Sequence, residues 1–224
     1  MKITLTWRSV RCIVMANILE EERRGKMNLI ERVKGILLRP KQEWQTIGGE
    51  TASIAELYKG YVVPLAAIGP IASVIGMSLV GLSLPFVGTV RIPITTSIGS
   101  AVVHYILTLA GVYILALVID ALAPTFAGEK NVTQAFKVAA YSYTAGWVVG
   151  IFTIIPVLSV LSILGLYGLY LLYLGLPVLM KSPQEKSLGY TIAVIVAAIV
   201  IFVVIGIVSR AFITYPMPSM PMRG

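Results

Sequence analysis

Two ionisable side chains, His104 and Asp120, lie within one long apolar segment of this 224-residue chain. An ionisable group inside a bilayer is costly and usually has a function. The two residues are 16 positions apart, about 24 Å along an ideal helix, so they cannot touch directly. We therefore expect a structural or interfacial role for Asp120, with a proton or substrate role as the alternative. We expect His104 to be hydrogen-bonded and to face the other helices.

Tyrosines recur at helical spacing in a second apolar region. Tyr167, Tyr170 and Tyr173 are three residues apart, and Tyr141 and Tyr143 come earlier in the same region. Hydroxyl groups in membrane helices often form hydrogen bonds between helices. We expect these tyrosines to bond between helices or to lie at an interface, and the alternative is a polar lining for the path of a small substrate.

Small residues four positions apart indicate close helix packing. Gly146 and Gly150 form a Gly-x-x-x-Gly pair, and Gly69 and Ser73 form a similar pair in an earlier segment. Such pairs allow helix backbones to approach closely, either within one chain or between two chains.

The motifs of common enzymes are missing from the sequence. It has no His-Glu-x-x-His segment, no Gly-x-Ser-x-Gly elbow and no glycine-rich loop ending in Gly-Lys-Ser or Gly-Lys-Thr. One histidine and one cysteine, Cys12, cannot build a His/Cys metal site, and an intramembrane aspartyl site needs a second carboxylate beside Asp120. We predict a non-enzymatic protein without a cofactor or a metal.

Composition predicts an all-α, polytopic membrane protein. Apolar residues make up 57% of the chain and charged residues 12%, and the mean hydropathy is +0.88. A soluble domain usually has roughly 25% charged residues. The net charge of +8 comes from residues outside the apolar segments, so we expect contact with membrane lipids and not with nucleic acid.

Five membrane-spanning helices are expected. Between Lys137 and Lys181 lie 43 uncharged residues, too many for one crossing of a core about 30 Å thick, and Pro156 marks the turn between two crossings. The expected spans are 61–86, 95–122, 138–155, 157–180 and 188–208, within a membrane domain of residues 58–209.

The regions outside this domain have different characters. Residues 1–26 are expected to be an untranslated or disordered leader, with Met27 as the alternative start. Residues 27–57 contain a basic amphipathic helix that ends at Pro40, and such helices lie in the headgroup layer, a depth that also suits Trp44. Residues 210–224 are expected to form a disordered tail.

The distribution of lysine and arginine predicts the orientation. Counting both residue types on alternate sides of five spans gives about 15 on the side of the N-terminus and about 3 on the other. Because positive residues remain in the cytoplasm, we expect a multi-pass protein of the inner membrane with a cytoplasmic N-terminus and an extracytoplasmic C-terminus.

Three segments of the chain are distinctive: the amphipathic segment with Pro40 and Trp44, the sequence AGEKNVTQAFKVAAYSYTAGW, and the sequence GLYGLYLLYLGLPVLMKSPQEKSLGYTIAV. Together with the five expected spans, they resemble the bacterial branch of the Yip family, the Ypt/Rab-interacting membrane proteins. The family usually has two glycines where this chain has Ala127 and Gly128, and often a proline where it has Ala145. The resemblance implies a five-span Yip domain, and in eukaryotes a role in vesicle traffic through binding of Rab-type GTPases.

We therefore expect a non-enzymatic scaffold or partner-binding protein that acts through its cytoplasmic face, with a homo-oligomer or another membrane protein as partner. The alternative is a small transporter or channel that uses Asp120, His104 and the tyrosines. The candidate interaction residues are Pro40, Trp44, Asp120, Gly128, Tyr141, Tyr143, Tyr167, Tyr170, Lys181, Pro183 and Lys186. The candidate helix-packing residues are Gly69, Ser73, Gly146 and Gly150.

Overall fold

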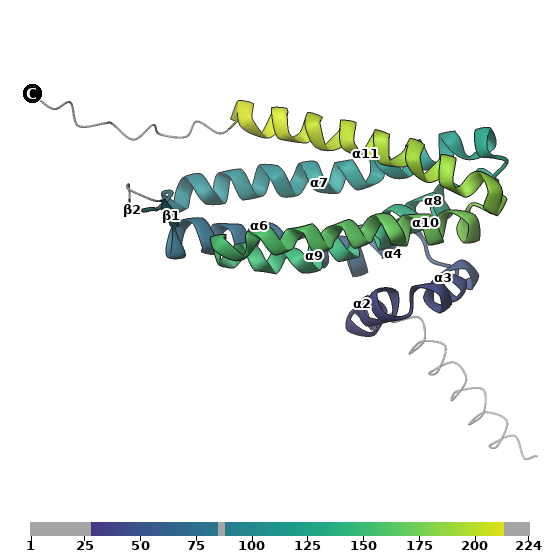
Figure 1. Cartoon of the computed structure of the whole chain (residues 1–224), viewed down its shortest axis with the longest axis horizontal. Coiled ribbons are helices and arrows are strands. Elements are labelled where there is room, and N and C mark those ends of the chain that lie inside the picture. Colours follow the sequence, from purple (N-terminus) through teal and green to yellow (C-terminus); the bar gives the residue numbers. More distant parts are fainter. Residues whose placement is uncertain (1–27, 85–87, 213–224) are drawn as a thin grey trace, which may run out of the picture.

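A computed structural model describes residues 28–84 and 88–212 of the chain. They form an elongated helical bundle, in which α7 and α11 run side by side in one layer and α6, α9 and α10 form a second layer (Figure 1). Two short helices, α2 and α3, pack at one end, and a small hairpin of β1 and β2 lies at the other. We call these ends the α3 end and the hairpin end.

The elements follow in this order: α2 (Leu29–Leu38), α3 (Pro40–Gly49), α4 (Ile54–Leu57), η1 (Tyr58–Val62), α5 (Val63–Ala66), α6 (Ile68–Ile75), η2 (Gly76–Val80), β1 (Leu82–Leu84), β2 (Gly88–Val90), α7 (Ile94–Leu122), η3 (Ala123–Phe126), α8 (Val132–Ser142), α9 (Thr144–Val149), η4 (Gly150–Ile154), η5 (Pro156–Leu166), α10 (Tyr167–Leu179) and α11 (Gln184–Phe212). The leader 1–26, Cys12 and the tail from 213 onward lie outside the described residues.

The first long helical segment runs from α4 to η2. It begins at a capping box, in which the Ser53 side chain accepts from the backbone of Glu56 and the Glu56 side chain accepts from the backbone of Ser53. Pro64 lacks an N–H group, but the helical path continues through it, with a π-helical turn, η1, directly before. The segment stops at Val80, earlier than the expected residue 86. The chain then turns back through an antiparallel hairpin in which Leu82 pairs with Val90.

The second long helix, α7, ends in a tight connection to α8. Ala127 has a left-handed backbone with a φ of 55°, at the position where the Yip family usually has glycine. Asn131 caps α8 by accepting from the backbone N–H of Gln134 at 3.0 Å. The return bond of a capping box is not formed, because the Gln134 Oε1 atom is buried without a hydrogen-bond partner in the described chain.

The uncharged stretch after Lys137 folds back on itself at the predicted proline. Residues 132–154 form one helical path through α8, α9 and η4, and the second path begins at Pro156 after one extended residue, Ile155. The helix η5 has 3₁₀ geometry over 11 residues, an unusual length, before the chain continues as the α-helix α10.

Within the described chain, four helices are long and apolar enough to cross a bilayer. They are Ile54–Val80, Ile94–Phe126, Pro156–Leu179 and Gln184–Ser209. The remaining helical path, 132–154, is less apolar because it includes Gln134, Lys137 and several hydroxyl side chains. The chain is therefore an all-α, polytopic membrane protein, and its exposed large apolar side chains lie mainly on the outward faces of these helices.

The small residues allow close packing within this chain. A β-carbon on Gly150 would lie 3.0 Å from the α-carbon of Gly69, and one on Gly165 would lie 3.3 Å from the α-carbon of Gly146. The first pair brings η4 against α6, and the second brings η5 against α9. Ser73 is exposed and takes no part in these two contacts.

Candidate functional site

The amphipathic N-terminal region folds onto the bundle at the α3 end. Trp44 has no exposed surface, although the sequence placed it in the headgroup layer. Its indole ring lies over Gly175 of α10, where a β-carbon would come within 2.7 Å of the ring. The edge of the ring also meets Tyr141, with ring centroids 6.1 Å apart. Trp44 therefore anchors α3 to α10 and is not an exposed interaction residue.

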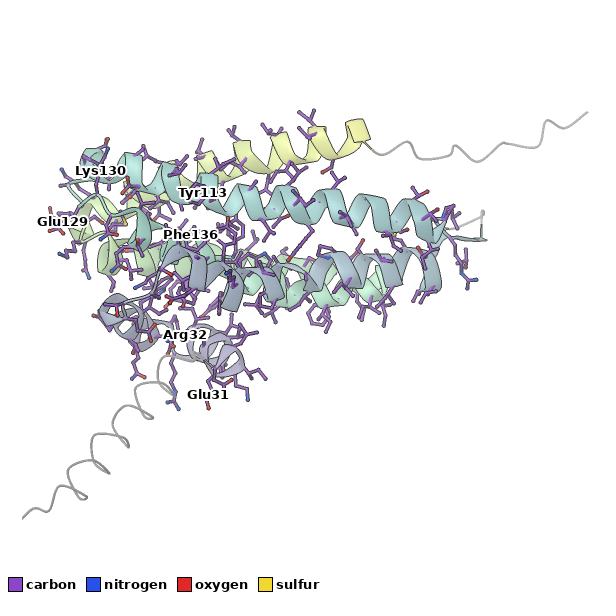
Figure 2. All side chains as sticks on the ribbon, turned by 180° about the vertical axis from the view of Figure 1, so that it is seen from behind. Glu31, Arg32, Tyr113, Glu129, Lys130 and Phe136 are labelled. Atoms are coloured by element: carbon purple, nitrogen blue, oxygen red, sulfur yellow. The ribbon has the colours of Figure 1, made fainter. Side chains whose placement is uncertain are left out.

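An ion-pair cluster ties α2 to α3. The Arg32 guanidinium bonds to Glu43 at 2.5 Å and also to Glu50, and Figure 2 shows Arg32 on the side of α2 toward the bundle, with Glu31 pointing away. Burial opposes the charge of Arg32, but Tyr141, Glu50 and Glu43 outweigh this effect and raise the pKa of Arg32 above its ordinary value. The Glu43 carboxylate fits beside Gly35, where a β-carbon would overlap it.

Lys137 joins this cluster from the bundle side. Its side chain is buried, and Nζ donates to the carbonyl oxygens of Ile47 at 3.0 Å and Glu50 at 2.6 Å. These carbonyls belong to the last turn of α3 and the residue after it, where a cation is favourable because carbonyls there lack helical partners. Lys137 therefore anchors the end of α3 to α8.

The tyrosine hydroxyls form hydrogen bonds between elements. Tyr61 bonds to Thr144 at 2.7 Å, Tyr167 donates to the carbonyl of Leu37 at 3.0 Å, and Tyr58 donates to the carbonyl of Leu109 at 2.6 Å. The ring of Tyr141 is fully buried and lies 4.6 Å from that of Tyr61. Tyr141 and Tyr167 thus connect elements within the protein, in line with the expectation of bonds between helices.

Two loops meet beside these helices at the α3 end. The backbone N–H of Glu129 donates to the carbonyl of Met180 at 2.8 Å, and the exposed side chains of Lys181 and Glu129 are paired at 2.7 Å. A β-carbon on Gly128 would lie 2.8 Å from the Met180 carbonyl oxygen, so the close approach requires glycine. Figure 2 shows Glu129 at the extreme end of the bundle. Pro183 and Lys186 follow in the second loop and at the start of α11, and both are exposed.

A shallow basic hollow of about 390 Å³ lies where α3 begins. It is lined by Arg39, Pro40, Lys41, Gln42 and Tyr170. The Tyr170 ring is 43% exposed, unlike the buried ring of Tyr141. Pro40 and Tyr170 are therefore close together on the surface, although 130 residues separate them in the sequence.

Asp120 and His104 lie in different places. Asp120 is in the last turn of α7 at the α3 end, and its Oδ1 atom is buried without a hydrogen-bond partner in the described chain. The neighbouring Tyr190 donates to the Ile119 carbonyl at 2.5 Å and stacks on Phe126.

His104 lies farther along α7 toward the hairpin end, where it lines a cleft of about 490 Å³ together with Tyr143 and Gly146. His104 thus faces the other helices, as the sequence predicted, but its side chain is exposed to the cleft between them.

The described residues that cluster at the α3 end contact one another across elements far apart in the sequence. In residues 28–84 and 88–212, no group of three His, Cys, Asp or Glu side chains is placed to bind a metal ion. Sequence reasoning missed Arg32, which joins α2 to α3, Lys137, which joins α8 to α3, and Tyr61, which bonds to Thr144. One feature of the sequence could have indicated the role of Lys137, because this residue is the last charge before a long uncharged stretch.

The model of the Yip1 domain matches residues 34–205, from α2 into α11. The chain belongs to the Yip1-domain family. Two curated relatives, both named inner membrane protein YohC, come from Escherichia coli strain K12 and Escherichia coli O6:H1 strain CFT073. Each is 25% identical over 180 residues, which cover 79% of this chain and 92% of the relative. No solved structure matches. The resemblance to the Yip family seen in the sequence is thereby confirmed, and the Yip1 domain includes α3 and both loops of the α3 end.

Proposed function

We propose that this protein is a non-enzymatic scaffold of the inner membrane that binds a partner through the α3 end. The single observation that carries the proposal is the docking of α2 and α3, because ion pairs and a buried tryptophan hold them firmly instead of leaving them in the headgroup layer. With α2 and α3 docked, the start of α3 lies at the same end of the bundle as the loop 127–131 and the loop 180–183, which contact each other (Figure 1). The inner membrane location is supported by the name of the relatives.

We propose that this face is cytoplasmic and that the chain crosses the membrane five times. Helical path 132–154 reaches from the α3 end toward the hairpin end, where η4 packs on α6 (Figure 1). Counting it as a span puts the N-terminus, the loop 127–131 and the loop 180–183 on one side and the C-terminus on the other. The side so defined carries most of the lysine and arginine residues, as cytoplasmic loops do.

The chemistry of the face favours an acidic partner or anionic lipid headgroups. Arg39, Lys41 and Lys186 are exposed there, and neither Arg39 nor Lys41 forms an ion pair with a described residue. Tyr170, which belongs to the candidate span Pro156–Leu179, adds a partly exposed aromatic side chain beside Arg39 and Lys41. Exposed cations around an aromatic ring are typical of binding surfaces, in which tyrosine and arginine are enriched.

The test is site-specific crosslinking in cells. A photoreactive amino acid at Tyr170 or Lys186 should crosslink to a defined partner, while the same amino acid at exposed Arg91 of the hairpin end should not. Lys41→Glu should reduce the Tyr170 adduct several-fold because it reverses the local charge. Equal adducts from Arg91 and Tyr170, or none from the α3 end, would contradict the proposal.

The second candidate, a small transporter or channel, is supported by the cleft beside His104 and Tyr143. Asp120 is not among the residues that line this cleft. Tyr167 does not line it either, since its hydroxyl bonds to the backbone of α2. A transporter would therefore use His104 and Tyr143 without Asp120. Uptake assays in vesicles would distinguish the two functions, because His104→Leu should abolish transport and leave partner crosslinking at Tyr170 intact.

A further inference from the structure

The cleft beside His104 lies in the half of the bundle away from the proposed partner-binding face. Its walls come from α6, α7, α9 and α11. His104 is ten residues into α7, about 15 Å along the helix and within the candidate membrane span Ile94–Phe126. The cleft therefore places polar groups inside the part of the bundle that crosses the membrane.

Polar side chains in the cleft are available to form hydrogen bonds with a bound molecule. The Ser209 hydroxyl is buried without a hydrogen-bond partner among the described residues, and the His104 imidazole is exposed to the cleft. The hydroxyls of Ser73 and Thr108 line the same space. Because unpartnered polar groups in a low-dielectric interior are costly, these groups indicate an occupant that supplies hydrogen-bonding atoms.

Charge is missing from the lining. None of the residues that line the cleft is Asp, Glu, Lys or Arg. A phosphate or carboxylate at this depth would have no counter-charge, and an unpaired charge in the membrane interior is strongly unfavourable. The occupant is therefore uncharged.

One wall of the cleft is aromatic. Tyr143 stacks on Trp147 with ring centroids 5.8 Å apart, and Phe202 meets the edge of Tyr143 at 5.9 Å. These rings give the cleft a flat, apolar side opposite the polar groups of α7. An occupant that combines oxygen atoms with apolar surface fits both walls.

An apolar groove of about 410 Å³ adjoins the cleft. Pro70 of α6 and Ala101 of α7 line both spaces, and the groove is otherwise lined by residues such as Ile71, Ile98 and Val102. These three side chains are at least 49% exposed and face the hydrocarbon of the membrane. A polar cleft and an apolar groove that share two residues are complementary to a molecule with a polar head and an apolar tail.

We propose that this cleft binds an uncharged amphiphile whose oxygen-bearing head lies beside His104 and whose hydrocarbon tail lies in the groove between α6 and α7. Two classes of membrane molecule share this chemistry, the diacylglycerols and the quinones with an isoprenoid tail. This site is independent of the partner-binding face at the α3 end, so either proposal can fail without the other.

The test uses the full chain in lipid nanodiscs with a diacylglycerol that carries a diazirine on its acyl chain. After illumination, saturable labelling should be found in peptides of α6 and α7. Unlabelled diacylglycerol or a short-tailed ubiquinone should compete, and the stronger competitor identifies the class of ligand. Phosphatidylglycerol, which has the same tails and a charged head, should not compete. Labelling that does not saturate, or that phosphatidylglycerol reduces equally, would overturn the proposal.

Two glycines supply a matched pair of variants. At both Gly146 and Gly99, an added β-carbon would have no atom within 4 Å. Gly146 lines the cleft, whereas Gly99 is exposed on α7 and does not line the cleft. Gly146→Leu should therefore fill the cleft and reduce labelling at least tenfold, while Gly99→Leu should leave it unchanged. His104→Leu is the second variant, and it should weaken labelling several-fold through loss of the imidazole. Unchanged labelling in both Gly146→Leu and His104→Leu would overturn the proposal.

Discussion

The indole ring of Trp44 occupies the space that a side chain at Gly175 would fill. A β-carbon at Gly175 would lie 2.7 to 2.9 Å from three ring carbons of Trp44, which is closer than such contacts are found in proteins. The glycine thus allows α3 to approach α10, and α2 docks on the bundle together with α3.

Gly175→Ala should release α3 from α10, because the tryptophan ring is rigid and has no free space around it. Overpacking of this kind costs about 1–3 kcal/mol. Hydrogen exchange of backbone amides in residues 29–50, measured in mild detergent, should become faster by one to two orders of magnitude. Gly48→Ala is the control, since its β-carbon would meet Val178 of the same interface at an ordinary 3.8 Å. Equal protection of the backbone amides in the Gly175→Ala and Gly48→Ala variants would show that glycine at position 175 is not needed for the packing of α3 on α10.

Lys137→Met should destabilise the protein by about 1–3 kcal/mol, because it removes the Nζ donor of the Glu50 carbonyl and leaves the Ile47 carbonyl with only the long bond from the Glu50 N–H. Thermal unfolding in detergent would measure the loss, and proteolysis should cut first after α3. Lys130→Met makes the same change at an exposed position and should alter stability by less than about 0.5 kcal/mol. A stability equal to that of the unmodified protein would mean that these hydrogen bonds do not hold α3.

Ala127→Gly should stabilise the connection between α7 and α8 by about 1 kcal/mol, because a left-handed backbone is strained for every residue with a β-carbon. The same replacement at Ala121, an exposed residue within α7, should destabilise by a similar amount through loss of helix propensity. Thermal unfolding of the two variants under the same conditions would check the opposite signs. A decrease in stability at Ala127 would contradict the left-handed assignment.

A reporter that is active only outside the cytoplasm should give a signal when fused at the C-terminus and none at the N-terminus. A fusion that ends after Ile155, at the turn between the two uncharged paths, should also give a signal, because helical path 132–154 is proposed to cross the membrane. Fusion after Glu129 is the control and should be silent. A silent fusion after Ile155, together with a signal from the one after Glu129, would reverse the orientation.

Much of the architecture could be predicted because it depends on local sequence. The turn at Pro156 follows from the length of the uncharged stretch, and the cap of α8 follows from Asn131 alone. The candidate site was harder, because its key contacts join distant positions: Trp44 and Gly175 are 131 residues apart, and Lys137 bonds to residues 47 and 50. An amphipathic pattern shows that a helix has an apolar face, but it does not show whether lipid or protein covers that face. The sequence therefore indicated Trp44 as a membrane-interface residue when it is a core residue.

The long 3₁₀ helix η5 has a consequence for how the chain fits its membrane. A 3₁₀ helix rises about 2.0 Å per residue and an α-helix about 1.5 Å, so these 11 residues extend about 5 Å farther than they would as an α-helix. Rewinding η5 into an α-helix would shorten its span by that length while every turn kept its backbone hydrogen bonds. A change of a few ångströms is also the difference in hydrocarbon thickness between natural membranes. The length of this span therefore depends on the helix type of η5, by an amount similar to the difference in thickness between natural membranes.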